Sequence, residues 1–176
     1  MRKTRVDHTP QNKFWKNAMV GIGGLGMLLV VLLTQVHFSI NKTQSLPYKI
    51  FICVHGIALH RGDFVSIHNH PTRYLGKIHY TKRLMGLPGD KILIHHKKAY
   101  INTRTGHNHL IGSLLQKTKD GKPLHSISET TIPEGYVFVS ADHPRSFDSR
   151  YKEFGLVKQE NIWGKCFGFF KCGEGQ

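Results

Sequence analysis

The chain has 176 residues and is strongly basic, with 25 Lys and Arg residues against 11 Asp and Glu residues. Basic chains often bind nucleic acid, but this sequence has no helix-turn-helix, zinc-finger or aromatic RNA-binding signature, so we expect no nucleic acid partner. Its 13 His residues include no His-Glu-x-x-His motif and no paired Cys knuckle, so we expect neither a metal ion nor another cofactor.

The first 40 residues predict a membrane anchor. Residues 18–40 give 23 mostly apolar positions without charge, whereas about 20 suffice to cross a bilayer. Five basic residues and one acidic residue precede them, so the positive-inside rule places residues 1–17 in the cytoplasm. A cleaved signal peptide is the alternative, but its apolar core is usually only about 7 to 15 residues long. We therefore expect a transmembrane helix over residues 18–40 and one external domain over residues 41–176.

Ser45 and Lys82 are the candidate chemical pair. Ser45 begins a Ser-Leu-Pro segment soon after the apolar stretch, and Lys82 begins the run Lys-Arg-Leu-Met-Gly-Leu-Pro-Gly-Asp. A serine becomes a good nucleophile when another group takes its proton, and a lysine can do this only as a neutral amine. An ordinary lysine has a pKa near ~10.4, so about one molecule in a thousand is neutral at pH 7. The chemistry therefore requires burial that lowers the pKa of Lys82.

Beyond the apolar stretch the hydrophobic pattern becomes strand-like. Short runs of β-branched and aromatic residues are bounded by Gly, Pro, Asn or Asp, which is typical of strands separated by turns. Residues 103–131 are more polar, and we expect them to leave the sheet, with a short helix near residues 110–117. The sequence thus predicts a mainly β domain with strands at residues 49–54, 64–67, 76–85, 91–95, 99–102, 136–140 and 162–170.

Three cysteines suit an oxidising compartment if two of them pair. Cys166 and Cys172 are the candidates because they flank a loop of five residues, although the sequence leaves the pairing open. Cys53 lies in an apolar run, where we expect it to be a buried, unreactive side chain.

Four segments, in this order, resemble the type I signal peptidase (S26) family, whose members are membrane-bound serine proteases with a Ser/Lys dyad. The lysine segment and the last segment are the most specific in combination. The resemblance implies a mainly β, signal-peptidase-like domain outside the membrane after one N-terminal transmembrane helix, with serine endopeptidase activity. The segments are Ser-Leu-Pro at 45–47, Arg-Gly-Asp-Phe-Val at 61–65, the lysine run at 82–90 and Ser-Phe-Asp-Ser-Arg at 146–150.

By this resemblance Ser45 is the nucleophile, and Lys82 is the general base and later the general acid. The backbone N–H of Ser45 would donate to the oxyanion of the tetrahedral intermediate, an interaction whose loss typically costs about 100 to 1,000-fold in rate. Thr43 matches the place of a second donor hydroxyl in the family. The alternative for Thr43 is a solvated residue without a role in the reaction.

The last segment would support the lysine. Ser146 matches the family serine whose hydroxyl orients the lysine amine. Asp148 and Arg150 resemble a structural ion pair, and two residues apart on an extended segment they project to the same side. The alternative is a polar turn with an exposed ion pair worth less than about 1 kcal/mol.

Two departures favour one branch of the family. Common members have one more residue between the serine and the proline, and a Gly-Asp-Asn stretch where this chain has Ser-Ala-Asp-His at 140–143. The segments Ser-Leu-Pro and Ser-Phe-Asp-Ser-Arg-Tyr are more similar to the conjugative-transfer, or TraF-type, branch. This resemblance implies maturation of a pilin precursor at the bacterial inner membrane, by cleavage and in some members by cyclisation, with the catalytic domain in the periplasm and other transfer-apparatus proteins as partners.

Two alternatives stand beside the pilin hypothesis. The first is a general signal peptidase that removes N-terminal leaders from many exported proteins. The second is a non-catalytic, anchored assembly protein of the transfer apparatus. Because a scaffold requires neither Ser45 nor Lys82, the presence of both residues favours an enzyme.

Overall fold

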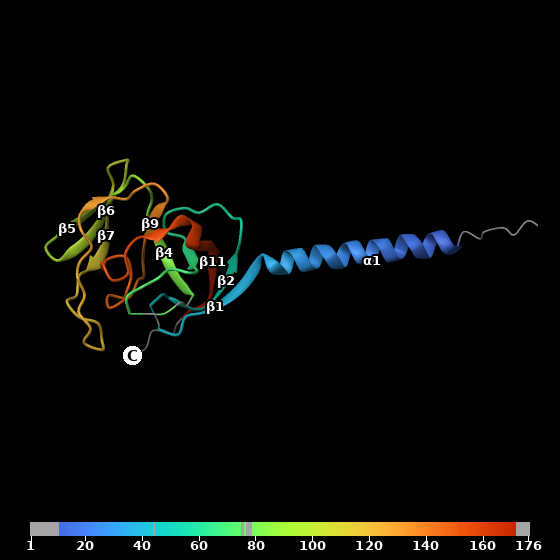
Figure 1. The fold of residues 1–176 in the computed structure, drawn as a ribbon, viewed down its shortest axis with the longest axis horizontal. Coiled ribbons are helices and arrows are strands. Elements are labelled where there is room, and N and C mark those ends of the chain that lie inside the picture. Colours follow the sequence, from blue (N-terminus) through green and yellow to red (C-terminus); the bar gives the residue numbers. More distant parts are fainter. Residues whose placement is uncertain (1–10, 44, 75, 77–78, 172–176) are drawn as a thin grey trace, which may run out of the picture. The chain divides into compact units, whose positions relative to one another are not determined.

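The computed structural model describes residues 11–43, 45–74, 76 and 79–171. The chain divides into two compact units, Met1–Val36 and His37–Gln176, which are considered separately. The first unit contains the helix α1, Gln11–Thr34, and the second contains two β-sheets (Figure 1).

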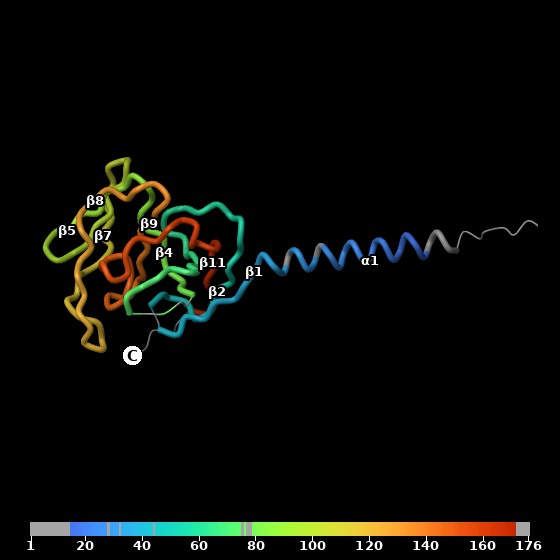
Figure 2. The backbone as a smooth tube through the Cα atoms, in the orientation of Figure 1, coloured from blue at the N-terminus to red at the C-terminus, as the bar shows by residue number. Residues whose placement is uncertain are grey.

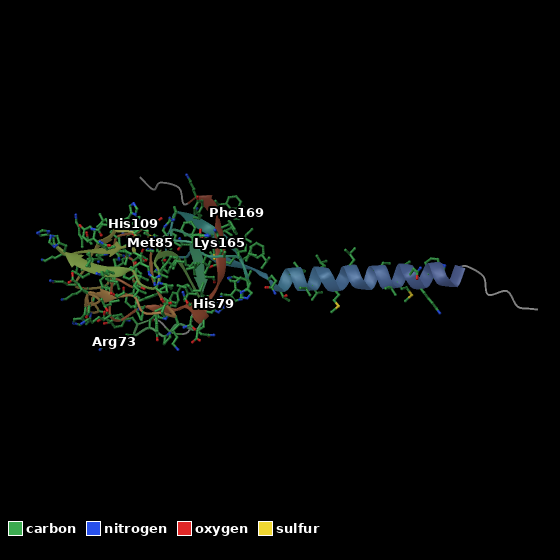
Figure 3. All side chains as sticks on the ribbon, turned by 90° about the horizontal axis from the view of Figure 1, so that it is seen from above. Arg73, His79, Met85, His109, Lys165 and Phe169 are labelled. Atoms are coloured by element: carbon green, nitrogen blue, oxygen red, sulfur yellow. A yellow bond between two sulfur atoms is a disulfide. The ribbon has the colours of Figure 1, made fainter. Side chains whose placement is uncertain are left out.

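The helix α1 carries exposed apolar side chains along its length. Their exposed fractions run from 48% for Val31 to 76% for Val20, and Figure 3 shows side chains projecting from the helix on several sides. In the part of the chain that the structure describes, no helix is long and apolar enough to cross a membrane.

The transmembrane helix expected over residues 18–40 is not found in the described residues, and the bounds of the helix that is present, Gln11–Thr34, differ at both ends. The helix stops at Thr34, and the next residues form strand β1, Val36–Ile40, beside β2, Tyr48–Val54. His37, in this segment, contacts two residues of the β domain. Its ring meets the ring of Trp163 edge-on at 4.1 Å between centroids, and its Nε2 atom lies 3.1 Å from the hydroxyl of Ser66. These contacts favour the sheet over another helical turn.

The prediction of a mainly β domain is confirmed. The larger sheet has the strand order β1-β2-β11-β3-β4-β9-β10, and the smaller has the order β7-β6-β5-β8. The C-terminal strand β11 lies between β2 and β3, so the two ends of the domain share one sheet (Figure 2). The remaining elements are β3 Phe64–Ile67, β4 Tyr80–Gly86, β5 Lys91–His95, β6 Lys98–Asn102, β7 Asn108–Ser113, β8 Thr130–Thr131, β9 Tyr136–Ser140, β10 Val157–Lys158, the 3₁₀ turn η1 Gln159–Asn161 and β11 Ile162–Lys171.

Two further local predictions are wrong. The helix expected near residues 110–117 is absent from the described residues, because residues 108–113 form β7 and pair with β6. This pairing includes a register shift, and Gly112 has a φ of 151°, a conformation that glycine adopts easily. The strand expected over residues 76–85 is shorter, since β4 begins at Tyr80.

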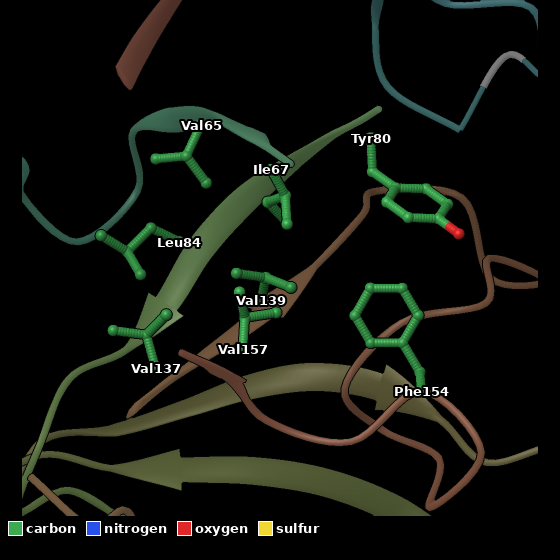
Figure 4. Close-up of a cluster of buried hydrophobic side chains, with 8 residues drawn as sticks. All are labelled: Val65, Ile67, Tyr80, Leu84, Val137, Val139, Phe154 and Val157. Atoms are coloured by element: carbon green, nitrogen blue, oxygen red, sulfur yellow. The ribbon is translucent and has the colours of Figure 1, made fainter. Parts of the chain in front are cut away.

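A cluster of buried side chains packs around β3, β4, β9 and β10. Figure 4 shows these side chains converging from the neighbouring strands. Alternate residues of β4 are buried, so residues 80, 82, 84 and 86 face the interior of the domain. The strand period therefore places Lys82 on the same face as core residues. The cluster consists of Val65, Ile67, Tyr80, Leu84, Val137, Val139, Phe154 and Val157.

A disulfide joins Cys53 on β2 to Cys166 on β11. The candidate pair Cys166 and Cys172 is therefore wrong, and Cys172 itself lies outside the described residues. The two bonded cysteines are 113 residues apart in sequence, but the antiparallel pairing of β2 with β11 places them directly opposite each other. Strand register, rather than closeness in sequence, selects the partner.

We expect the Cys53→Ser/Cys166→Ser double variant to lose about 2 to 4 kcal/mol of unfolding free energy, because the bond closes a long loop in the unfolded chain. Urea denaturation of the domain with and without reductant measures this loss. Cys172→Ser is the matched control and should unfold like the wild type. Peptide mapping without reductant that recovers a Cys166–Cys172 linkage would contradict the pairing.

Candidate active site

Lys82 is buried at the centre of the candidate site. Its side chain is 7% exposed, and its Nζ atom donates a hydrogen bond to the hydroxyl of Ser146 at 2.9 Å. Burial lowers the pKa of Lys82 below the ordinary lysine value; the carboxylate of Asp148 opposes this effect, and the positive charge of Arg150 adds to it. The net lowering favours the neutral amine, which is the form that can accept a proton.

Asp148 and Arg150 form a buried ion pair beside Lys82. Their exposed fractions are 0% and 1%, and two side-chain hydrogen bonds join them, from Nε to Oδ1 at 2.8 Å and from Nη2 to Oδ2 at 2.9 Å. Arg150 also donates to the backbone carbonyls of Ser146 at 3.0 Å and Pro144 at 3.2 Å. The pair therefore fixes the turn that carries the Ser146 hydroxyl.

Ser45 lies in the loop between β1 and β2 and is brought to the same turn. Its carbonyl oxygen accepts a hydrogen bond from the backbone N–H of His143 at 3.1 Å. The next side chain, Leu46, is 2% exposed and packs in a core cluster that includes Ala141. Residues 141–146 consequently contact Lys82 on one side and, on the other, the β1–β2 loop that carries the candidate nucleophile Ser45, called the nucleophile loop below.

The hydroxyl of Ser45 has Thr43 as its nearest hydrogen-bond partner. The Thr43 hydroxyl donates to Ser45 Oγ at 3.1 Å, and Ser45 Oγ lies 3.5 Å from the side-chain oxygen of Asn41. Among the described residues, no hydrogen bond joins Ser45 Oγ to Lys82 Nζ, which is bonded to Ser146. Catalytic hydrogen bonds are often loose without substrate, and rotation of the Ser45 side chain about χ1 is what would redirect its hydroxyl.

Two contacts at the site are ones that the sequence did not indicate. Arg83, next to Lys82 on β4, forms a two-bond ion pair with Asp142, at 2.9 and 2.7 Å, and so ties the lysine strand to residues 141–146. Asn41 uses its side-chain amide to bond two carbonyls of the nucleophile loop, those of Leu46 and Tyr48. The place of Arg83 beside Lys82, on the opposite face of the strand, is the sequence signal that it is near the site. Its ion-pair partner Asp142 could not be predicted, because it is distant in sequence.

The Arg-Gly-Asp segment contacts the end of the lysine segment. Arg61 donates to the carboxylate of Asp90 at 2.6 Å, so the Arg-Gly-Asp segment is bound to the end of the lysine segment. Asp63 is paired with Lys165 on β11 at 2.9 Å. The first ion pair joins the segment before β3 to the turn after β4, and the second joins that same segment to β11.

Comparison with known proteins gives consistent matches. Residues 13–170 match the family model described as Signal peptidase, peptidase S26. Signal peptidase I U of Bacillus subtilis (strain 168) is 33% identical over 118 residues, which cover 65% of this chain and 60% of the relative. Signal peptidase I of Bacillus caldolyticus is 36% identical over 93 residues, covering 49% and 50%, and that of Pseudomonas aeruginosa is 31% identical over 137 residues, covering 61% and 47%.

The chain spans between 47% and 60% of the length of these three relatives. A solved signal peptidase I from Enterococcus faecalis V583 aligns with 62% of this chain and 97% of its own, at 24% identity and a TM-score of 0.39. Because the family model matches residues 13–170, which is most of the sequence, the chain belongs to the signal peptidase family, peptidase S26.

Proposed function

We propose that this chain is a serine endopeptidase that removes N-terminal leader segments from exported proteins. The observation that carries the proposal is the burial of Lys82 on β4, where its amine donates a hydrogen bond to the Ser146 hydroxyl. The turn that carries Ser146 also binds the Ser45 loop, through the backbone of His143. Curated relatives of the chain are named signal peptidase I, which supports the general leader-removing activity.

The proposed reaction begins when the Ser45 hydroxyl attacks the scissile carbonyl and Lys82 takes its proton. The new bond joins Ser45 Oγ to the carbonyl carbon, and the oxyanion that forms is stabilised by the Ser45 N–H and, in this proposal, by the Thr43 hydroxyl. The C–N bond then breaks, and the Lys82 ammonium returns its proton to the departing amine. Lys82 then deprotonates a water molecule, whose oxygen bonds to the acyl carbon. The bond from that carbon to Ser45 Oγ breaks, and the Lys82 ammonium returns the proton to Oγ.

In this scheme Ser146 and the ion pair act on Lys82 rather than on the substrate. The Ser146 hydroxyl holds the amine at 2.9 Å, and Arg150 holds the backbone of Ser146. Asp148 and Arg150 carry opposite charges and form an ion pair, so the pair adds little net charge beside the buried lysine that it supports.

We further infer that α1 associates the enzyme with a bacterial inner membrane, residues 1–17 facing the cytoplasm. The exposed apolar side chains of α1 and the five basic residues that precede residue 17 support this association. The disulfide between Cys53 and Cys166 suits an oxidising compartment, which supports a periplasmic place for the second unit.

A second candidate function is maturation of a pilin precursor for conjugative plasmid transfer. The specific observation that favours it is the short Ser45-Leu46-Pro47 segment, together with the run Ser-Phe-Asp-Ser-Arg-Tyr at 146–151. Both functions share the acyl-enzyme on Ser45. Water would give a cleaved pilin, and the amine of the same chain held near the ester would give a cyclic one.

Ser45→Ala and Lys82→Ala should each abolish cleavage of a precursor, because the first removes the nucleophile and the second removes the base. The measurement is the conversion of precursor to product in cells, followed by gel mobility. Both variants should fractionate with membranes as the wild type does, which separates loss of chemistry from loss of protein. Normal processing by either variant would overturn the dyad.

The rate of acylation should rise with pH as Lys82 loses its proton. Because burial lowers the pKa of Lys82, the midpoint of this rise should lie below 10.5, the ordinary lysine value. Single-turnover cleavage of a purified precursor across pH 5 to 10 measures it. Lys98→Ala, at an exposed position on β6, is the control and should leave the midpoint unchanged. A rate independent of pH would contradict a lysine base.

Mass spectrometry of a co-expressed pilin separates the two candidate functions. If the pilin hypothesis is correct, mature pilin should appear only in cells that contain this chain, and a product one water lighter than the linear trimmed chain would indicate cyclisation. If pilin mass is the same with and without the chain, the substrate is another protein and the general leader-removing function is favoured.

A further inference from the structure

Asn41 forms hydrogen bonds across the nucleophile loop. It follows β1 directly and lies four residues before Ser45. Its side-chain Nδ2 donates to the carbonyl oxygen of Leu46 at 3.0 Å and to that of Tyr48 at 3.1 Å, while its backbone N–H donates to the carbonyl of Lys49 at 2.8 Å. One residue thus joins the end of β1 to three carbonyls on the far side of the loop.

Asparagine is chemically suited to this position. Its amide offers two N–H donors on one nitrogen, and both are used here. An aspartate has the same shape but presents only acceptors when ionised, so it would face two carbonyl oxygens with a negative charge. The residue after Leu46 is Pro47, which has no N–H, so the peptide between them offers only the carbonyl that Asn41 binds.

The backbone around Ser45 is consequently held at two successive carbonyls. His143 binds the carbonyl of Ser45 itself, and Asn41 binds that of Leu46, whose side chain is buried. Both bonded carbonyls lie on the C-terminal side of Ser45, so rotation of the Ser45 side chain about χ1 can redirect the hydroxyl while these two peptide groups stay in place.

The side-chain oxygen of Asn41 leaves the Ser45 side chain free to rotate. Its Oδ1 atom lies 3.4 Å from the Thr43 hydroxyl and 3.5 Å from the Ser45 hydroxyl. Both distances exceed the usual 2.5 to 3.0 Å range for O–H···O bonds, so these contacts are weak. The amide therefore holds the loop backbone firmly and the nucleophile hydroxyl loosely.

We propose that Asn41 is a positioning residue that fixes the backbone of the nucleophile loop so that the Ser45 hydroxyl can turn onto Lys82. Asn41 acts through the Leu46 and Tyr48 carbonyls, which its side-chain amide binds. The inference rests on the proposed protease function, but the state of the loop can be measured without any substrate.

The first experiment is hydrogen–deuterium exchange on purified Asn41→Ala, followed by mass spectrometry of peptides covering residues 45–52. These peptides should exchange faster than in the wild type, while peptides from β5 and β6 stay unchanged. Asn108→Ala, at an exposed residue of the smaller sheet, is the matched control and should leave residues 45–52 protected. Wild-type exchange in Asn41→Ala would overturn the proposal whether or not the chain is a protease.

The second experiment is steady-state cleavage of a precursor by the same proteins. Misplacing a nucleophile by about 1 Å typically costs about 100-fold, so we expect Asn41→Ala to lower kcat by about 10 to 100-fold with KM within about twofold. Asn41→Asp should lose more, and Asn41→Gln, which keeps both donors, should recover part of the rate. The pH midpoint of the reaction should not move, because Lys82 is untouched.

The outcomes are separable. A faster-exchanging loop with wild-type kcat would overturn the positioning role, and so would a loss confined to KM. A fall in activity that tracks a lower melting temperature in all three variants would also overturn it, since a purely structural residue behaves in that way. If the wild type cleaves no precursor, the proposed protease function fails, while the exchange result still decides whether Asn41 holds the loop.

Discussion

The burial of Lys82 is the constraint on which the rest of the site depends. Strand β4 alternates so that residues 80, 82, 84 and 86 face the interior, and a lysine occupies one of these four positions. A buried ammonium is costly, so the fold has to supply either a partner or a lower pKa. It supplies both: the Ser146 hydroxyl accepts from Nζ, and burial lowers the pKa of Lys82.

Residues 141–150 connect the buried Lys82 to the rest of the site. This segment binds Lys82 through Ser146, binds the Ser45 carbonyl through the backbone of His143, and is fixed internally by the pair of Asp148 and Arg150. A second ion pair, from Arg83 to Asp142, joins it to the lysine strand. The disulfide adds a covalent link between β2, which follows the nucleophile loop, and β11, which pairs with β3 beside β4.

The predictions that succeeded are those in which short sequence patterns dominate. The strands at residues 64–67, 91–95 and 136–140 have the predicted bounds, because their apolar runs end at clear turn residues. The errors at residues 36–40 and 110–117 have one cause. Residues 36–40 and 108–113 are strands because each pairs with a strand elsewhere, β1 with β2 and β7 with β6, and local apolarity does not reveal such partners.

By itself the sequence determined a mainly β domain and predicted a Ser45/Lys82 site, since strand period and motif spacing are written in neighbouring residues. Only the tertiary structure decided that Cys53 bonds Cys166 and that Asn41 holds the nucleophile loop. It also decided that the Ser45 hydroxyl is hydrogen-bonded to Thr43, while the Lys82 amine is hydrogen-bonded to Ser146. Hydrogen bonds and disulfides depend on atomic distances between segments far apart in the chain, and those distances are fixed only when the strands pair and the core packs.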